Sequence, residues 1–515
     1  MLTKIAARRW GSRRFALLDD EVLTFAELDS WADCIASDLA AHGVAWGDRV
    51  LIMSPNRLEI LSAVGACWAV GAVAVPVVSI YRQHEVAAII ADAFPSAVVV
   101  QEHVSDRNLC AEVDSCLAAA NCVPAVKYTC DPPTDVAGGW RVLPDRHTAA
   151  AVPVPAAPVT GESECLRLYT SGTTAQPKGA RLSSAGVVAS SRLYHDVYGL
   201  GERDVNLALA PVTHIAGMIA AFLVPLTCGA SAVVMRRWDA ATAVDLIDRE
   251  KVTWTLGAAV FLTDLVAEYE SRTQPVHVLP KFISGGANTS PDLVERADRL
   301  GIRAIRIYGM TETAGPAALA SASEPLERRA YWDGMRVEGV EIQIVDDDGR
   351  EAAPGVEGHI RLRGSRVMLG YSRAEDNEAY LAGGWFDPGD MGVVDEQGWV
   401  RITGRTKDII NRGGEKFSAA DIELALERHP AIHRVAVIGV PHGRLGESVC
   451  AFVVPAPGTC EEDASGDKLA QFLLAQGVAK QKIPTEWHVV AYLPISATGK
   501  VQKNLLRSLR DSPAQ

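Results

Sequence analysis

The sequence predicts an α/β protein with a large N-terminal domain, a strand-rich part after it, and a small C-terminal module. Helix-like and strand-like segments alternate from residue 23 to about residue 308, the order expected of βαβ units in a parallel sheet. After Tyr331 the pattern changes to short strands joined by tight turns. A chain of 515 residues is also too long for one compact core. We therefore expect two domains, residues 1–404 and residues 405–515.

The first half of the chain carries the clearest βαβ unit. Thr24 and Glu27 have the spacing of a capping box and predict the start of a helix. The unit follows as a strand at 49–53, a helix at 58–70 and a strand at 72–79. Further strands are predicted at residues 96–101, 231–235, 252–256, 281–284 and 303–308. Residues 131–164, rich in Pro, Ala, Gly and Val, predict a long surface connection.

The second half predicts paired strands and then a compact module. Asp348–Gly349 and Gln397–Gly398 are turn sequences between segments of strand-like pattern. The predicted pairs are 340–345 with 359–363, and 391–394 with 400–403. The module after Arg405 is predicted to contain helices at 420–428 and 469–475, and strands at 434–439, 448–454 and 487–491.

Charge and hydropathy argue against several classes of function. A net charge of −13 repels phosphate backbones, so we do not expect a nucleic-acid partner. Two long uncharged stretches, residues 60–81 and 205–235, are interrupted by Gly and Pro and predict buried elements, with no membrane span. The basic N-terminus has no apolar run behind it, so we do not expect a secretory signal. A basic transit peptide is the less favoured alternative, because strand-like sequence is expected there at once.

The ten cysteines are spread thinly and form no C-x-x-C pair. Their tightest group is spaced too loosely for a usual zinc site and consists of Cys110, Cys116, Cys122 and Cys130. We expect reduced, mostly structural thiols in a cytoplasmic protein, with metal binding by this group as the minor alternative.

Residues 168–179 form the segment with the strongest chemical signal, Leu-Tyr-Thr-Ser-Gly-Thr-Thr-Ala-Gln-Pro-Lys-Gly. Hydroxyls, backbone N–H groups and one lysine are the donors that a triphosphate needs, and glycine lets the backbone approach it closely. The candidate ligands are Thr170, Ser171, Gly172, Thr173, Thr174 and Lys178. The segment is not a Walker A motif, because Lys178 precedes Gly179. A flexible surface turn is the alternative.

A second candidate segment is Tyr308-Gly309-Met310-Thr311-Glu312-Thr313, which follows a predicted strand and so lies at the sheet edge where α/β proteins bind ligands. Glu312 can hold Mg²⁺, a cation that prefers oxygen ligands. Thr311 can donate to a phosphate, and the Tyr308 ring can stack on a base.

Three more side chains each have a functional and a structural interpretation. Asp390 can accept two ribose hydroxyls, or it can cap a turn. Lys500, beside Gly499, can neutralise charge that develops on a phosphate and a carboxylate, or it can be a surface lysine. His214 lies in an apolar run and can be catalytic or a core histidine.

From about residue 20 to residue 507 these motifs occur in the order found in the adenylate-forming superfamily, and the chain resembles that family. It comprises acyl-CoA synthetases, peptide-synthetase adenylation domains and beetle luciferases, and the chain is most similar to acyl-CoA ligases. Ala175 and Pro388 depart from residues frequent in the family. The resemblance implies that Asp390 binds ribose, Arg405 contacts the nucleotide, and Lys500 joins carboxylate to phosphate during adenylation. It also places Tyr308, Gly309, Gly286 and Ala287 at the nucleotide.

The resemblance further implies two working states. Gly413 and Gly414 would line a tunnel for the CoA thiol, and a rotation about Lys407 would exchange this loop for Lys500. The fold implied is a large N-terminal α/β domain ending in a distorted β-barrel, plus a small mobile C-terminal α+β domain.

The activity expected is therefore that of an acyl-CoA ligase using ATP, Mg²⁺ and CoA. An enzyme that passes the acyl group to an amine or a carrier-protein thiol is the alternative, and a nucleotide-binding protein without catalysis is a third hypothesis. The candidate acid pocket suits a medium-chain, alicyclic or aryl acid and comprises His214, Gly217, Met218, Ala221, Phe222, Gly285 and Gly286. We expect a monomer or homodimer.

Overall fold

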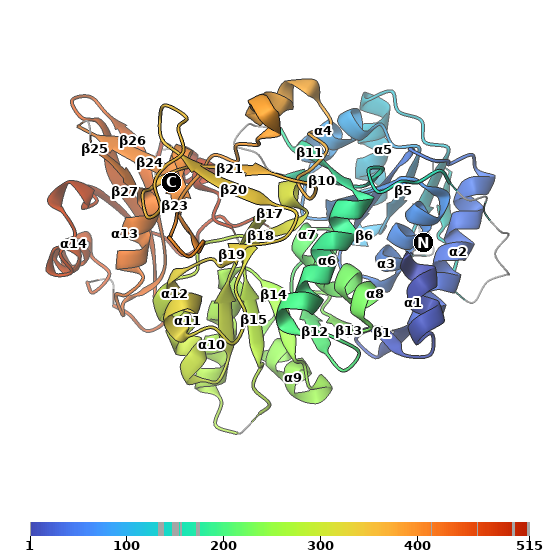
Figure 1. The fold of residues 1–515 in the computed structure, drawn as a ribbon, viewed down its shortest axis with the longest axis horizontal. Helices are drawn as coiled ribbons and strands as arrows, with labels where there is room; N and C mark the ends of the chain where they lie inside the picture. Colours follow the sequence, from blue (N-terminus) through green and yellow to red (C-terminus); the bar gives the residue numbers. More distant parts are fainter. Residues whose placement is uncertain are drawn as a thin grey trace.

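The computed structural model describes residues 2–131, 139–146, 154, 157–170, 176–274, 276–413, 415–460, 462–496 and 500–511. Figure 1 shows the chain running from its N-terminal part on the right to a C-terminal module on the left. The structure has three main parts: two large sheets with helices, two small antiparallel sheets, and the C-terminal module.

The first large sheet has seven strands in the order β11-β10-β4-β3-β5-β8-β9. Its strands are β3 (Arg49–Ser54), β4 (Val73–Val78), β5 (Ala97–Val100), β8 (Val126–Thr129), β9 (Trp140–Val142), β10 (Glu164–Thr170) and β11 (Lys178–Ser183). All neighbours pair in parallel except β10 and β11, which form a hairpin around residues 171–177. Strand β4 is buried along its whole length, as expected of a strand covered on both faces.

The second large sheet also has seven strands, in the order β16-β15-β14-β12-β13-β1-β2. They are β1 (Arg14–Leu18), β2 (Glu21–Thr24), β12 (Val205–Ala208), β13 (Ser231–Val234), β14 (Trp254–Gly257), β15 (Lys281–Ser284) and β16 (Arg303–Arg306). Only β1 and β2 pair antiparallel in the described sheet. The parallel strands β15 and β16 point their carboxyl ends at one edge, where the candidate site begins.

Helices cover both sheets (Figure 1). They are α1 (Leu2–Trp10), α2 (Phe25–Ala41), α3 (Leu58–Val70), α4 (Gln83–Ala93), α5 (Leu109–Ala119), α6 (Ser184–Tyr198), α7 (Ile215–Met218), α8 (Val224–Cys228), α9 (Ala240–Glu250), α10 (Ala259–Ser271), α11 (Pro291–Arg299) and α12 (Leu326–Tyr331). The predicted capping box is present, with Thr24 and Glu27 bonded to each other's backbone N–H groups at the start of α2. Helix α3 ends at Gly71, whose φ of 76° is the left-handed conformation that favours glycine.

Two small antiparallel sheets make up the strand-rich part that was expected to be a distorted barrel. The three-stranded sheet contains β17 (Tyr308–Met310), β18 (Gly315–Leu319) and β19 (Met335–Arg336). The four-stranded sheet contains β20 (Glu341–Val345), β21 (Gly358–Arg363), β22 (Asp390–Val394) and β23 (Val400–Arg405). A bridge between Met335 and Trp399 joins the two sheets.

The C-terminal module is a five-stranded sheet with helices on both faces. Its elements are β24 (Ile409–Arg412), β25 (Glu415–Ser418), α13 (Ala419–Leu426), β26 (Ile432–His442), β27 (Gly446–Pro455), α14 (Gly466–Ala475), β28 (Glu486–Val489) and α15 (Lys503–Asp511). Alternate residues of β26 face opposite sides, so Val437 packs with α13 and α14 while Ile438 packs with Leu506 of α15. An ion pair of 3.4 Å links Arg434 of β26 to Asp264 of α10 in the large N-terminal part.

Three predictions about individual elements were wrong. The chain begins with helix α1, not with a strand, because Ala6 and Trp10 form a buried face that packs on the core. Within the predicted long connection, Trp140–Val142 forms edge strand β9, whose Trp140 is buried. Tyr308 does not end the strand that precedes it but begins β17 in a different sheet. Within the described residues, no helix is both long and apolar enough to cross a bilayer.

Candidate active site

Asp390 contacts two other predicted nucleotide residues, Arg405 and Tyr308. It is the first residue of β22 and lies opposite Arg405, the last residue of β23, in the antiparallel register. This pairing lets Arg405 Nε approach Asp390 Oδ1 at 2.9 Å, while the Tyr308 hydroxyl donates to Oδ2 at 2.8 Å. The Asp390 carboxylate raises the pKa of Arg405, and burial, reinforced by the same carboxylate, raises the pKa of Tyr308. Tyr308 is therefore neutral and Arg405 charged at any physiological pH.

Glu312 lies in the single helical turn Thr311–Thr313 that follows β17. The Tyr371 hydroxyl donates to its Oε1 at 2.8 Å, and the Thr170 hydroxyl lies 3.4 Å from the same oxygen. Its backbone carbonyl accepts a hydrogen bond from the Met368 N–H at 2.7 Å. Thr170 ends β10, so Glu312 sits where the predicted phosphate loop begins.

The geometry of Glu312 fits a magnesium ligand. Among the described residues, Oε1 takes both hydrogen bonds and Oε2 takes none, although the side chain is largely buried. A carboxylate oxygen held in this way is a ligand of the kind that Mg²⁺ prefers. Lys178, Arg405 and Lys500 bring positive charge to the same region, although the chain as a whole has a net charge of −13.

Lys178 is the first residue of β11, and its ammonium lies 3.2 Å from Asp376 Oδ1 and 5.3 Å from the centre of the Tyr371 ring. Both phosphate-side groups, Lys178 and Glu312, thus contact Tyr371. The predicted ligands Ser171, Gly172, Thr173 and Thr174 lie outside the described residues.

Lys500 lies close to these groups although it is nearly two hundred residues from Glu312 in the sequence. Its Cε would lie 3.5 Å from a Cβ at Gly286, in the turn after β15 that also contains Gly285 and Ala287. Burial lowers the pKa of Lys500 and the Arg405 charge lowers it further, while Glu312 and Asp390 oppose the shift. Its backbone N–H donates to the Ser496 hydroxyl at 3.2 Å.

His214 is the N-cap of α7, and its Nδ1 accepts the Ala216 N–H at 3.4 Å. Burial lowers the pKa of His214 to about 3, and the nearby Lys500 charge contributes to the shift. The imidazole is therefore neutral at physiological pH and sits beside the lysine.

The remaining pocket candidates follow His214 along α7 and into the next turn. Gly217 is required there, since a Cβ would lie 2.1 Å from the Pro211 carbonyl oxygen. Residues Ile219–Leu223 form a turn of π-helix, a distortion frequent at functional sites. Met218 and Ala221 are fully buried. The ring of Phe222 packs in the core between Phe15 and Trp68, at 6.0 and 5.4 Å between ring centres.

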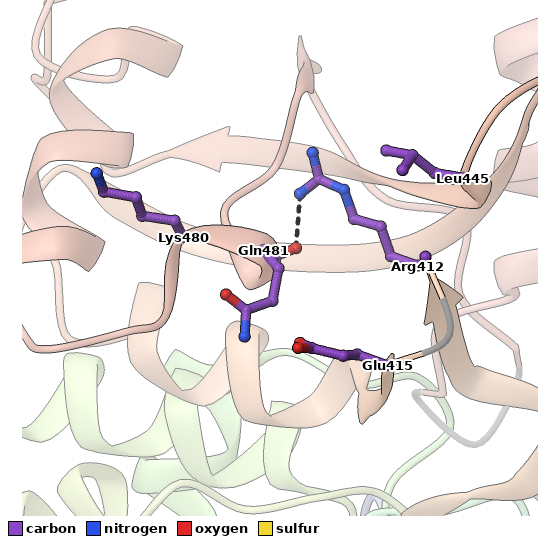
Figure 2. A pocket seen from close by; sticks show the side chains of 6 residues that line it. Arg412, Glu415, Leu445, Lys480 and Gln481 are labelled. Atoms are coloured by element: carbon purple, nitrogen blue, oxygen red, sulfur yellow. Dashed lines mark hydrogen bonds between the residues drawn. The ribbon is translucent and has the colours of Figure 1, made fainter.

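Gly413, a predicted tunnel residue, borders an open groove of about 410 Å³ (Figure 2). All its lining residues belong to the C-terminal module: Arg412, Gly413, Glu415, Leu445, Lys480 and Gln481. Figure 2 shows Arg412 pointing across the groove, where it donates to the Gln481 carbonyl at 2.6 Å. Gly414 lies outside the described residues. Lys407, the predicted hinge, is in the turn Thr406–Asp408 between β23 and β24.

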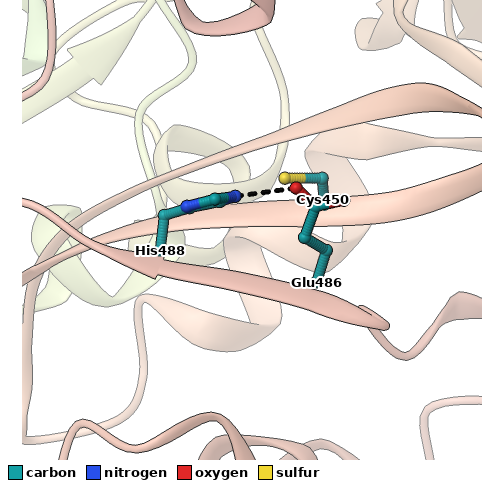
Figure 3. Close-up of side chains that lie close together, drawn as sticks. All are labelled: Cys450, Glu486 and His488. Atoms are coloured by element: carbon teal, nitrogen blue, oxygen red, sulfur yellow. Dashed lines mark hydrogen bonds and ion pairs between the residues drawn. The ribbon is translucent and has the colours of Figure 1, made fainter. Parts of the chain in front are cut away.

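Sequence reasoning missed a cluster of Cys450, Glu486 and His488 on β27 and β28 (Figure 3). Arg510 already forms an ion pair with Glu486, and its Nε lies 3.0 and 3.1 Å from the two carboxylate oxygens. Burial raises the pKa of Cys450 to about 12, so its thiol stays protonated. The cluster is explained by its hydrogen bonds and ion pair.

All ten cysteines lie in the described part of the chain, and none forms a disulfide. Burial raises the pKa of the thiols in the predicted loose group, which matches their expected structural role. Cys460, in the C-terminal module, is the one fully exposed cysteine.

Family models place the chain among known proteins. Residues 4–372 match the AMP-binding enzyme family, and residues 421–500 match the AMP-binding enzyme C-terminal domain. The chain belongs to the AMP-binding enzyme family. The first range falls within the large N-terminal part, and the second falls within the C-terminal module.

Curated relatives and solved structures resemble this AMP-binding enzyme over nearly its whole length. It is 32% identical to the medium-chain fatty-acid–CoA ligase of Escherichia coli (strain K12), over 94% of this chain and 85% of the relative. It is 32% identical to the indoleacetate–CoA ligase of Aromatoleum aromaticum, over 95% and 93%.

Among solved structures, ATP-bound MatB from Rhodopseudomonas palustris has a TM-score of 0.86, at 28% identity over 99% of both chains. The o-succinylbenzoate coenzyme A synthetase MenE from Bacillus subtilis, with ATP and magnesium ion, has a TM-score of 0.83, at 26% identity over 98% of this chain and 99% of that one. These likenesses confirm the predicted superfamily and the predicted α/β fold with a small C-terminal domain.

Proposed function

We propose that this AMP-binding enzyme is an acid–thiol ligase that activates a carboxylic acid with ATP and transfers the acyl group to CoA. The observation that carries the proposal is the position of Lys500: its Cε would lie 3.5 Å from a Cβ at Gly286, and its pKa responds to the charges of Arg405, Glu312 and Asp390. Binding a nucleotide requires no lysine from a second module, whereas a cation placed between a carboxylate and a phosphate stabilises the charge that develops when the two are joined. The curated relatives support CoA as the acceptor, since both are named CoA ligases.

In the first half-reaction, a carboxylate oxygen of the acid attacks the α-phosphorus of ATP. The bond from that phosphorus to the bridging oxygen breaks, which releases pyrophosphate and leaves acyl-AMP. Lys500 neutralises the charge that gathers on the carboxylate and the phosphate, and Asp390 holds the ribose hydroxyls. Mg²⁺ held by Glu312 would offset the charge of the phosphates.

In the second half-reaction, the thiol sulfur attacks the acyl carbon, AMP leaves, and the thiol proton is released. The groove beside Gly413 lies in the module that carries Lys500. By rotating, one rigid module can therefore present either Lys500 or this groove to the acyl group. We propose that residues 405–515 rotate about Lys407 between these steps, with residues 1–404 as the fixed domain. Arg412 and Lys480 beside Gly413 would suit the phosphates of CoA.

The acid is proposed to be a medium-chain, alicyclic or aryl acid. The candidate pocket is apolar, and neutral His214 gives the acid carboxylate no second cation besides Lys500. The unpaired and mostly buried cysteines support the proposal that the enzyme acts in the cytoplasm.

Pyrophosphate release across a panel of carboxylic acids, measured with and without CoA, tests the function. We expect release with an apolar acid, and a thioester by mass spectrometry only when CoA is present. Release without any thioester, together with consumption of acyl-AMP by an amine or a carrier protein, would replace CoA by that acceptor. No release with any acid would contradict acid activation itself.

A further inference from the structure

Residues Leu369–Asn377, called here the clamp segment, run beside strand β11. Leu369 N–H donates to the Arg181 carbonyl at 2.8 Å, and Ser372 N–H donates to the Gly179 carbonyl at 2.8 Å. Tyr371 itself forms a β-bridge with Ala180. Because β11 begins at Lys178, this pairing fixes the clamp segment relative to the candidate phosphate lysine.

Tyr371 in this segment touches two groups of the active site with different parts of its side chain. Its hydroxyl donates to Glu312 Oε1 at 2.8 Å, and its ring lies under the Lys178 ammonium at 5.3 Å. The Asn377 side chain accepts the Tyr371 N–H at 2.7 Å and so fixes its backbone. The hydrogen bonds to the Glu312 carboxylate go to Oε1, so among the described residues its Oε2 keeps no hydrogen bond.

Asp376 completes the arrangement on the lysine side. Its Oδ1 lies 3.2 Å from Lys178 Nζ, and its Oδ2 accepts from Arg373 Nε at 2.8 Å. Arg373 also donates to the Pro177 carbonyl at 3.1 Å, so the clamp segment is hydrogen-bonded to the residue before Lys178 as well. Asp376 is mostly buried, where an ion pair with good geometry restrains both partners.

We propose that Tyr371 and Asp376 are positioning residues that hold Glu312 and Lys178 in place before Mg²⁺ and ATP arrive. The inference rests on the proposed function for the identity of the ligands and extends it to two residues outside the nucleotide motifs. Neither residue needs to touch the nucleotide. They restrict the conformations of the Glu312 carboxylate and the Lys178 ammonium in the free enzyme. These two groups therefore lose less conformational entropy when the ligands bind.

A purely structural role for Tyr371 is the competing explanation, because its ring also packs 6.4 Å from that of Phe386. Tyr371→Phe keeps the ring and removes only the bond to Glu312. Tyr380→Phe is the matched control: the Tyr380 hydroxyl donates to the Met368 carbonyl at 2.8 Å, and its ring is 5.4 Å from Phe386. It is a half-buried tyrosine that packs on the same Phe386 ring and has no hydrogen bond to Glu312.

Calorimetric titration of the full-length variants with ATP, at a series of magnesium concentrations and without any acid, provides the test. For Tyr371→Phe we expect the magnesium needed for half-maximal ATP affinity to rise about tenfold, the scale of one hydrogen bond to a charged group. ATP affinity measured in EDTA should stay within about twofold of wild type, and Tyr380→Phe should match wild type throughout.

A double-mutant cycle shows whether Tyr371 acts through Glu312. In a Glu312→Gln background, Tyr371→Phe should add less than about a twofold change, because the interaction it removes is already lost. Wild-type magnesium dependence of Tyr371→Phe, or an equal change in Tyr380→Phe, would overturn the role of Tyr371.

Asp376→Asn tests the ion pair with Lys178. It also provides the test of the proposal if thermal unfolding shows that the Tyr371→Phe variant is not folded. We expect ATP to bind several-fold more weakly both with magnesium and in EDTA, since Lys178 contacts phosphate and not metal. Unchanged affinity under both conditions would contradict the proposal. Binding is measured without acid or acceptor, so these outcomes are independent of whether acyl transfer to CoA is correct.

Discussion

Asp390 and Glu312 are each held by side chains from two other segments, whereas Lys500 is held through its backbone by Ser496. Among the described residues, no carboxylate lies within ion-pair distance of the Lys500 ammonium. The carboxylates belong to the large N-terminal part, and the lysine belongs to the C-terminal module. The carboxylates of the large N-terminal part are thus held by neighbouring side chains, whereas Lys500 of the C-terminal module has a charge whose pKa is lowered by burial.

This difference fits the proposal that the module moves between the two half-reactions. A lysine with strong ion pairs would resist leaving, while carboxylates without partners would change position each time the module moved. If this comparison is right, changes at Lys500 and at the hinge should separate the two half-reactions, and changes within the fixed part should not.

Lys500→Ala should have the largest effect. We expect acyl-AMP formation to fall by about 10²–10⁴, the scale of losing one group that stabilises developing charge. Thioester formation from acyl-AMP supplied ready-made should persist. Pyrophosphate exchange and thioester formation on the same folded protein measure the two steps, and an equal loss of both would contradict the assignment.

Lys407→Pro should affect the second step most. Lys407 lies in a 3₁₀ turn, whose φ of about −60° is also the φ that proline imposes, so the substitution favours the arrangement seen here. We expect pyrophosphate exchange to be retained and thioester formation to fall at least about tenfold. Lys407→Ala, which leaves the backbone free, is the control and should support both steps. Normal thioester formation in Lys407→Pro would rule out rotation at this residue.

The pH dependence should reveal the low solvation of Lys500. Its pKa is lowered in the free enzyme, so the ammonium is lost as pH rises through a value below the ordinary 10.5. The alkaline limb of kcat/KM for adenylation, which reports the free enzyme, should therefore fall below 10.5. Lys500→Arg stays charged and should lack this limb in whatever activity remains. A limb that persists unchanged in that variant belongs to another group.

Arg434→Gln should have the smallest effect. It removes the 3.4 Å ion pair between β26 and Asp264 of α10, a partly exposed contact of about 0–1 kcal/mol. We expect adenylation to slow by no more than about threefold and thioester formation from acyl-AMP to be unaffected or faster. Lys482→Gln removes a more exposed ion pair with Asp421, within the module, and should change neither step. Equal effects of the two variants would show that the Arg434–Asp264 ion pair has no specific role in either step.

Local signals in the sequence predicted most of the fold. Helix α3 begins and ends at the predicted residues 58 and 70, because an apolar run there is closed by a left-handed glycine. Lys500 and Glu312 could be named because each lies in a motif. Tyr371 could not, since its partner lies 59 residues earlier and only the folded path of the clamp segment brings the two together. Gly370 before it and the spacing of Arg373 and Asp376 were the available signals.

Helix α1 was missed for a similar reason. Its nine residues are too few for a helix that is stable by itself, and tertiary packing of Ala6 and Trp10 decides the outcome. Trp10 Nε1 donates to Glu202 at 2.9 Å, a contact 192 residues away in the sequence. Local sequence carries no information about such a contact.

The exposure of Cys460 gives the enzyme a natural attachment point for a fluorophore. A maleimide dye should react there well before it reaches the buried thiols, and the modified residue lies in the C-terminal module away from its core. Val123 is 91% exposed on the fixed part, so Val123→Cys would accept a second dye without disturbing packing. Energy transfer between the two positions would then follow the module in real time as ATP, acid and CoA are added in turn.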